Sequence, residues 1–273
     1  SSEASAAREA AIAALRSFDD LSAVAVVLAA RANAAIDAGD LAAAERDAAE
    51  IDAAALSSGN RESLAYSEEV RGRIAWLRGD LPAARRSLAQ AERLHVADGD
   101  LDLAGEIAIR HATEEYREGA VESAGRLLAA ALARLEGGGE GTTALVGATV
   151  RVRLAASAGR LAEAQNELDR LGAEHASSPS LTRRLAYLAA RGTLAGNRGR
   201  TDAMQADLRQ AVTLAENGGR VVEALELRLD LAALERRSGS SGPSRAAPEV
   251  ERVAGPLGLR QLVARAQRLG LGP

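Results

Sequence analysis

The sequence predicts an all-α fold: a right-handed α-solenoid of about six helical hairpins with cap helices at its ends, about 13 or 14 helices in total. Three observations predict it. Glycine recurs at a constant spacing that never slips, at Gly39, Gly79, Gly119, Gly159, Gly199 and Gly239. A second series of chain-breaking residues lies midway between these, at Gly59, Gly99, Gly139, Pro179 and Gly219. The stretches between the breaks are rich in Ala and Leu, which favour helices, so each stretch should form one helix and each pair one hairpin.

The elements follow from this frame in chain order. Residues 1–18 are Ala-rich and are expected to form the second helix of a hairpin whose first helix would precede residue 1 in a longer protein. Residues 19–238 hold the hairpin array, with one helix on each side of a turn glycine, as at 61–78 and 80–97. Asp40 and Asp80 follow turn glycines and can cap the next helix. Residues 239–273 leave the register and should form an irregular last hairpin and a C-terminal cap, with helices at 247–254 and 259–269.

Small residues recur at fixed distances from the turn glycines. Gly72 and Gly192 stand two turns of helix before a turn glycine, and Ala84 and Met204 occupy equivalent places shortly after one. We expect these two positions to face each other where the helices of a hairpin cross, with the large Met204 compensated by the small Gly192.

The stretch from 72 to 91 resembles the tetratricopeptide repeat. That family has a small residue early in the first helix of its hairpin, a glycine at the turn, and an Ala–large–Ala series in the second helix. Gly72, Gly79, Ala84, Leu88 and Ala91 match this pattern. The resemblance covers about residues 21–238, but the repeat is about 40 residues long rather than about 34, and the usual aromatic and proline signposts are missing. Repeats of this length occur in bacterial arrays attached to LuxR-type regulators, signalling ATPases, kinases and CHAT proteases.

Composition excludes several classes of function. The chain has no cysteine, which excludes disulfides and thiol chemistry, and its 34 basic residues are all arginine, which excludes phosphate-binding loops and Schiff bases that need lysine. The net charge of −4 predicts no nucleic-acid or membrane partner. His95, His111 and His175 lie on different hairpins and out of register, so no metal or other cofactor is expected. We expect a cytoplasmic protein that is not an enzyme.

The candidate binding site follows from the resemblance, which implies that the first helix of each hairpin lines a concave groove. Tyr66, Glu69, Arg73 and Trp76 fall on one face of the helix at 61–78. Trp76 and Tyr116 stand one full repeat apart, so we expect them to be neighbours on adjacent hairpins. Aromatic rings beside arginine would suit a peptide carboxylate; alternatively, the rings fill the core between hairpins. The predicted groove residues are Tyr66, Glu69, Arg73, Trp76, Thr113, Tyr116, Arg117 and Arg153.

These observations lead to two functional hypotheses. The family's carboxylate clamp is not reproduced, because lysine is absent, although Asn33 and Arg73 occupy related places. The sequence therefore predicts a non-catalytic scaffold that binds a peptide or protein segment in its groove, as the regulatory C-terminal part of a larger bacterial protein. The alternative is a sensing arm of a transcriptional regulator or signalling ATPase, in which a ligand or signal peptide changes the superhelical pitch. The oligomeric state is not predicted.

Overall fold

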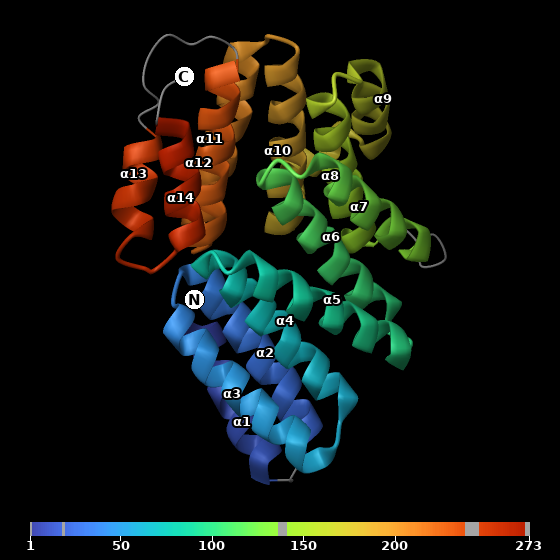
Figure 1. The fold of residues 1–273 in the computed structure, drawn as a ribbon, viewed down its shortest axis with the longest axis vertical. Helices are drawn as coiled ribbons and strands as arrows, with labels where there is room; N and C mark the ends of the chain where they lie inside the picture. Colours follow the sequence, from blue (N-terminus) through green and yellow to red (C-terminus); the bar gives the residue numbers. More distant parts are fainter. Residues whose placement is uncertain (1, 18–19, 136–140, 238–245, 271–273) are drawn as a thin grey trace. The chain divides into compact units, whose positions relative to one another are not determined.

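The computed structural model describes residues 2–17, 20–135, 141–237 and 246–270. Within these ranges the chain forms fourteen α-helices and one 3-10 helix and contains no β-strand (Figure 1). Neighbouring helices pack in pairs, so the all-α helical-repeat class predicted from the glycine spacing is confirmed. The chain divides into two compact units, Ser1–Ile107 and Ala108–Pro273, with the boundary inside helix α6. Each unit is described by itself.

Unit 1 is a stack of long helices. α2 packs against α3, α4 packs against α5, and α2 and α4 lie side by side. α1 covers α2, and Ile12 of α1 joins Val24, Leu28 and Ile51 in a buried apolar cluster. The helices are α1 Ser2–Ser17, α2 Leu21–Ala38, α3 Leu41–Ser58, α4 Arg61–Arg78, α5 Leu81–Asp98 and the first part of α6 Leu101–Arg117.

Unit 2 continues the hairpin pattern and ends in two short helices. α8 packs on α9 and α10, α10 on α11, and α11 on α12. The short helices α13 and α14 pack against each other and against α12. After the end of α6, the elements are α7 Val121–Leu135, α8 Thr142–Ser157, α9 Leu161–Leu171, the 3-10 helix η1 Ala173–Ser177, α10 Leu181–Asn197, α11 Thr201–Asn217, α12 Val221–Arg237, α13 Ala246–Ala254 and α14 Arg260–Gly270.

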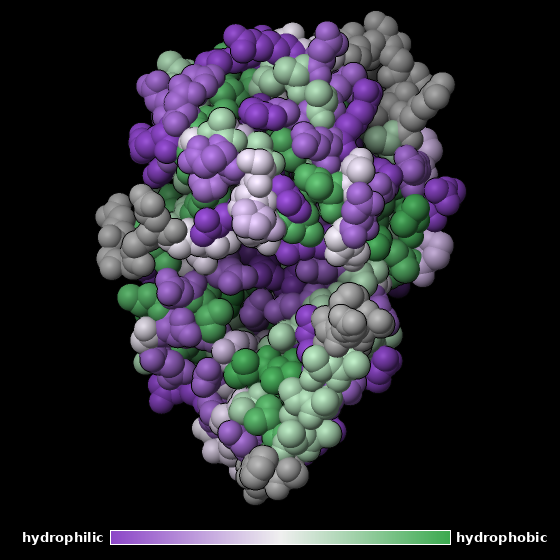
Figure 2. Space-filling model, turned by 180° about the vertical axis from the view of Figure 1, so that it is seen from behind, coloured by the Kyte–Doolittle hydropathy of each residue, from purple (hydrophilic) through white to green (hydrophobic). Residues whose placement is uncertain are grey.

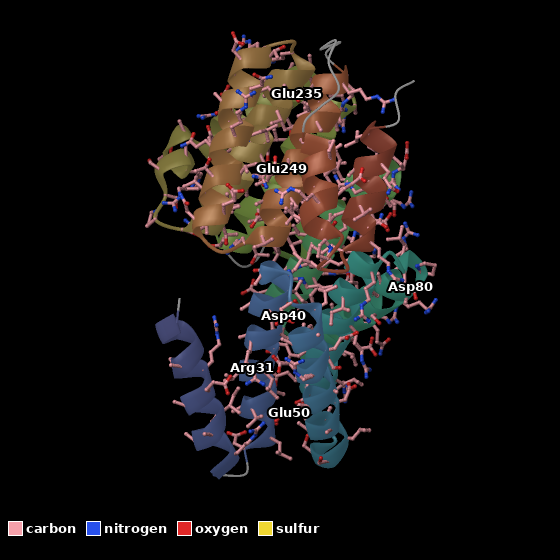
Figure 3. All side chains as sticks on the ribbon, turned by 90° about the vertical axis from the view of Figure 1, so that its left-hand side faces the viewer. Arg31, Asp40, Glu50, Asp80, Glu235 and Glu249 are labelled. Atoms are coloured by element: carbon pink, nitrogen blue, oxygen red, sulfur yellow. The ribbon has the colours of Figure 1, made fainter. Side chains whose placement is uncertain are left out.

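The turn glycines adopt the backbone conformation that makes glycine necessary. Gly39, Gly79, Gly119, Gly159 and Gly199 all have positive φ, between 72° and 86°, where a side chain would clash with the backbone. After two of these glycines an aspartate caps the next helix: Asp40 accepts from the amide of Ala43, and Asp80 from that of Ala83. Both caps were predicted (Figure 3 labels both aspartates). Gly139 and Gly239 lie outside the described residues.

The second series of breaks fails at one position. Where the pattern predicts a helix that continues to a turn at Pro179, α9 stops at Leu171. Gly172 takes the positive φ of 84°, and the chain continues as a 3-10 helix to Ser177. Pro179 cannot take a positive φ, and in this repeat the helix ends at the earlier Gly172, which can.

The packing register of the hairpins differs from the expected one. A Cβ atom on Gly72 would lie 2.8 Å from Leu88 Cγ, and one on Gly192 would lie 2.9 Å from Leu208 Cγ. The small residue on the first helix therefore faces a leucine in the middle of the second helix. Met204 instead approaches Gly196, at 2.7 Å from the place of its Cβ, so the predicted pair of Gly192 and Met204 is wrong. Glycine is needed at these crossings because a leucine fills the space.

Ion pairs join the two helices of three hairpins at equivalent repeat positions. In each pair an arginine of the first helix binds a buried carboxylate of the second helix, and the separation of the two residues along the chain is the same in all three pairs. Arg31 also reaches Glu9 of α1 and lies near Glu50 of α3 (Figure 3). The three pairs are Arg31–Asp47, Arg151–Glu167 and Arg191–Asp207.

The surface is mixed in character. Figure 2 shows hydrophobic side chains scattered among hydrophilic ones on one face of the molecule. Among the described residues, α2 is the only helix long and apolar enough to cross a membrane by length and composition, a test that core helices of soluble proteins also pass. Six of its residues, Leu28 and Ile36 among them, are buried in unit 1.

Candidate functional site

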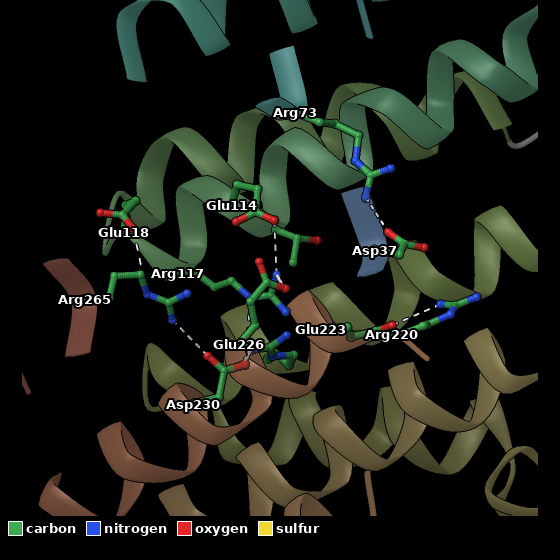
Figure 4. A network of polar contacts seen from close by, with 12 residues as sticks. Asp37, Arg73, Glu114, Arg117, Glu118, Arg220, Glu223, Glu226, Asp230 and Arg265 are labelled. Carbon is green, nitrogen blue, oxygen red and sulfur yellow. Dashed lines mark hydrogen bonds and ion pairs between the residues drawn. The ribbon is translucent and has the colours of Figure 1, made fainter. Parts of the chain in front are cut away.

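In unit 1, the neighbouring helices α2 and α4 present a connected set of polar side chains, which we call the α2–α4 ladder: Asn33, Asp37, Glu69 and Arg73. The Arg73 guanidinium donates to Asn33 Oδ1 through one nitrogen and to Asp37 Oδ1 through the other, the latter at 2.7 Å (Figure 4). Asn33 in turn donates to Glu69 Oε1 at 3.3 Å. The ladder thus places one arginine among a neutral amide and two carboxylates, an arrangement suited to orienting a planar guanidinium.

The ladder is partly open to solvent. The Arg73 side chain is 15% exposed and that of Asp37 is 37% exposed, whereas Glu69 is buried. The predicted residues Glu69 and Arg73 therefore belong to one polar site, which also contains Asn33 and Asp37.

The aromatic residues of unit 1 are placed differently. Tyr66 packs against the apolar cluster of α1, α2 and α3, and its ring meets that of His95 edge to face at 5.3 Å. Its hydroxyl donates to Glu62 at 3.2 Å, and burial together with Glu62 raises the pKa of the phenol above its usual value. Tyr66 is therefore partly buried against this cluster. Trp76 is also buried, with 3% of its surface exposed.

In unit 2, seven charged side chains from four helices form an ion network, named here the unit 2 network. Asp230 lies at its centre: it accepts from Arg153 at 2.6 Å and lies 3.3 Å from an Arg265 nitrogen and 3.9 Å from Arg117 Nε (Figure 4). All seven side chains are between 6% and 16% exposed. The members are Glu114, Arg117 and Glu118 on or directly after α6, Arg153 on α8, Glu226 and Asp230 on α12, and Arg265 on α14.

Two carboxylates of the network share one nitrogen. Arg117 Nη1 lies 3.2 Å from Glu114 Oε1 and is also in direct contact with Glu226 Oε2. On the other side, Glu118 lies 3.8 Å from Arg265 and accepts from the more exposed Arg268 at 2.8 Å. Four carboxylates therefore face three buried guanidinium groups and the more exposed one of Arg268.

Burial and charge act on these groups in opposite directions. Burial disfavours ionisation of Asp230, but Arg153, Arg117 and Arg265 outweigh it and hold its pKa below the usual value. Burial raises the pKa of Glu226 to about 8. Its main cationic neighbour, Arg117, lowers this pKa, but Glu114 close by raises it further. Arg117 stays charged, because Glu226, Glu114 and Asp230 overcome the effect of burial and raise its pKa.

The other predicted residues of unit 2 lie beside this network. The guanidinium of Arg153 stands over the ring of Tyr116, 4.8 Å from its centroid, and the Tyr116 hydroxyl lies 2.9 Å from Ser157 Oγ. Thr113 donates to the carbonyl of Ile109 one turn back in its own helix. The structure thus brings Tyr116, Arg117 and Arg153 together, with Thr113 turned to its own backbone.

Sequence reasoning missed the acidic half of the network. Glu226 and Asp230 stand one helical turn apart on α12, most of which is buried. Paired carboxylates on a helix that is apolar on most sides are a signal of buried ion pairing, because an unpaired buried charge is unstable. Arg265 carries the same signal on α14, where it is also buried.

The described parts of the chain contain no group of three or more His, Cys, Asp and Glu side chains that could hold a metal ion. No protein-family model matches the sequence, and no curated protein matches it. The resemblance to the tetratricopeptide repeat remains a prediction from the residues quoted above.

Proposed function

We propose that this chain is a non-catalytic interaction scaffold that binds an acidic segment of a peptide or protein through the first helices of its hairpins. One observation carries the proposal. Arg73 and Arg153 stand at the same repeat position, two repeats apart, on first helices of the two units. Each binds a carboxylate of its own unit, Asp37 for Arg73 and Asp230 for Arg153. This repeat position therefore has the chemistry to recognise carboxylates.

Unit 1 offers the more accessible of these arginines. Arg73 keeps 15% of its side chain exposed, against 6% for Arg153. A carboxylate of a bound segment would replace or join Asp37 at the guanidinium, while Asn33 holds the other nitrogen in place. The buried ring of Trp76 and the partly buried ring of Tyr66 would support the helix rather than contact the segment.

The resemblance to bacterial tetratricopeptide arrays extends this proposal. Those arrays are attached to regulatory and signalling domains. By analogy, binding of an acidic segment here would regulate another domain of the same polypeptide.

A selection experiment tests the proposal. The purified chain would be exposed to a library of random peptides, and the retained peptides sequenced. We expect enrichment of Asp and Glu for the wild type and loss of that enrichment for Arg73→Ala. The matched control is Arg71→Ala, which removes an arginine of the same helix that pairs with Asp52 outside the ladder. Equal enrichment by both variants, or no preference for acidic peptides, would contradict the proposal.

A further inference from the structure

The unit 2 network joins helices that are far apart in the sequence. The contact of Arg153 with Asp230 spans 77 residues, and that of Glu118 with Arg268 spans 150. These ion pairs attach α12 and α14 to α6 and α8 within unit 2. The stability of this attachment therefore depends on the charge balance of a few buried groups.

The charge balance is locally unequal at Arg117. Two carboxylates, Glu114 and Glu226, lie against the same nitrogen of Arg117, and like charges at this distance repel each other. A proton on Glu226 removes the repulsion between the two carboxylates at Arg117. Hydrogen bonding in the network is also incomplete, since Arg117 Nε, Arg153 Nε and Glu118 Oε1 find no hydrogen-bond partner among the described residues. A partly satisfied buried network is sensitive to any change of charge.

We propose that Glu114, Arg117 and Glu226 form a proton-controlled latch that holds α12 and α14 on α6 and α8 while Glu226 is protonated, and that weakens as the pH rises. The raised pKa of Glu226, about 8, agrees with a protonated Glu226 side chain in the closed latch. In an open form Glu226 is exposed to water and loses the proton at its ordinary pKa near 4.5. Between these two values, opening releases a proton, so each rise of one pH unit favours opening by about tenfold.

The surroundings of Glu226 support the role of this group. The charged groups acting on it come from α6 (Arg117 and Glu114), from α14 (Arg265) and from α12 itself (Asp230). α8 contributes through Arg153, which binds Asp230. The other sides of α12 carry separate contacts: Arg228 with Glu216 of α11 and Glu249 of α13, and Arg220 with Thr182 of α10.

Hydrogen exchange of the whole chain tests the latch. Amide exchange in α12 and α14 would be measured between about pH 5.5 and pH 7.5 for the wild type and for Glu226→Gln, which mimics the protonated form. At each pH the exchange rate of the wild type is divided by that of Glu226→Gln, which cancels the intrinsic pH dependence of amide exchange. We expect this ratio to rise by about tenfold per pH unit in α12 and α14, and to stay constant in α2 of unit 1.

Two further variants separate the latch from a general effect of charge removal. Glu223→Gln changes a glutamate of the same helix that is 32% exposed and pairs with Arg220, so we expect it to keep the wild-type pH dependence. Glu114→Gln removes the repulsion, so we expect a smaller pH dependence. A wild-type ratio that is constant with pH, or an equal effect of Glu223→Gln, would overturn the proposal.

A spectroscopic readout of the wild type guards against misfolded variants. The side-chain carboxyl carbon of Glu226 would be followed by NMR during a pH titration and assigned by its absence in Glu226→Gln. We expect its midpoint well above the ordinary glutamate value. A midpoint near 4.5 would overturn the latch, because the closed form would then hold no extra proton.

Discussion

The helix crossing at Gly72 offers a quantitative test of the hairpin packing. An alanine at this position would place its Cβ 2.8 Å from Leu88 Cγ and 3.1 Å from the Leu88 backbone nitrogen. The backbone of α5 cannot rotate away as a side chain could, so the two helices would have to separate. Overpacking of this kind costs about 1–3 kcal/mol, more than the roughly 1 kcal/mol that alanine gains over glycine inside a helix. We therefore expect Gly72→Ala to lower the free energy of unfolding by about 1 kcal/mol, within a net range that extends to about 2 kcal/mol.

Gly125 provides the matched control. It lies inside α7, and a Cβ on it would meet no described atom within 4 Å. Gly125→Ala should therefore show the helix preference alone and raise the free energy of unfolding by about 0.5–1 kcal/mol. Urea unfolding followed by circular dichroism measures both variants, and the fluorescence of Trp76, the only tryptophan, reports on unit 1.

A double-mutant cycle identifies the cause. In a Leu88→Ala background the contact atoms of the leucine side chain are gone, so the loss caused by Gly72→Ala should become smaller. If Gly72→Ala stabilises the protein as Gly125→Ala does, or if its effect is the same in both backgrounds, the close crossing of α4 and α5 is wrong.

Three further predictions concern buried polar groups. Glu226 binds its proton more tightly in the folded than in the unfolded protein, so the free energy of unfolding should fall by about 1.4 kcal/mol per pH unit between pH 4.5 and 8. Urea unfolding at several pH values measures this slope, and Glu226→Gln should remove it. Equal slopes for wild type and variant would contradict the prediction. Neither ring nitrogen of the buried His95 has a hydrogen-bond partner within the described chain. His95→Leu should therefore raise the midpoint of thermal unfolding by the equivalent of about 1 kcal/mol. A lower midpoint would refute this prediction. Asp207→Ala removes the bidentate partner of Arg191. It should lower the midpoint of urea unfolding by the equivalent of about 1 kcal/mol. An unchanged midpoint would show that the ion pair does not stabilise the protein.

The helices were largely predictable because their ends are encoded locally. A turn glycine with positive φ and an aspartate cap require only residues within a few positions of each other, so the ends of α4 and α5 were predicted to within one residue. The exception at Pro179 also has a local cause. Its signal was the nearby Gly172, the residue that ends α9 in place of the proline.

The contacts between helices were less predictable. The sequence predicted that Gly72 faces Ala84, one helical turn before the Leu88 that it actually meets. Equal spacing from the turn does not reveal how two helices are rotated about their own axes. The acidic partners of Arg117 and Arg153 lie on α12, in a repeat far along the chain. Such pairs depend on the three-dimensional path of the hairpins, which a repeat spacing alone does not determine.

The central claim, that the first helices recognise an acidic segment, is tested most directly by a binding titration. Trp76 stands one helical turn from Arg73 on α4, so its fluorescence should respond when a segment binds the α2–α4 ladder. A glutamate-rich peptide taken from the selection would be titrated into wild type, Arg73→Ala and Arg71→Ala. The account predicts saturable binding that weakens at least about tenfold in Arg73→Ala, since a charge-assisted pair is lost, and is unchanged in Arg71→Ala. The same affinity for wild type and Arg73→Ala would contradict it.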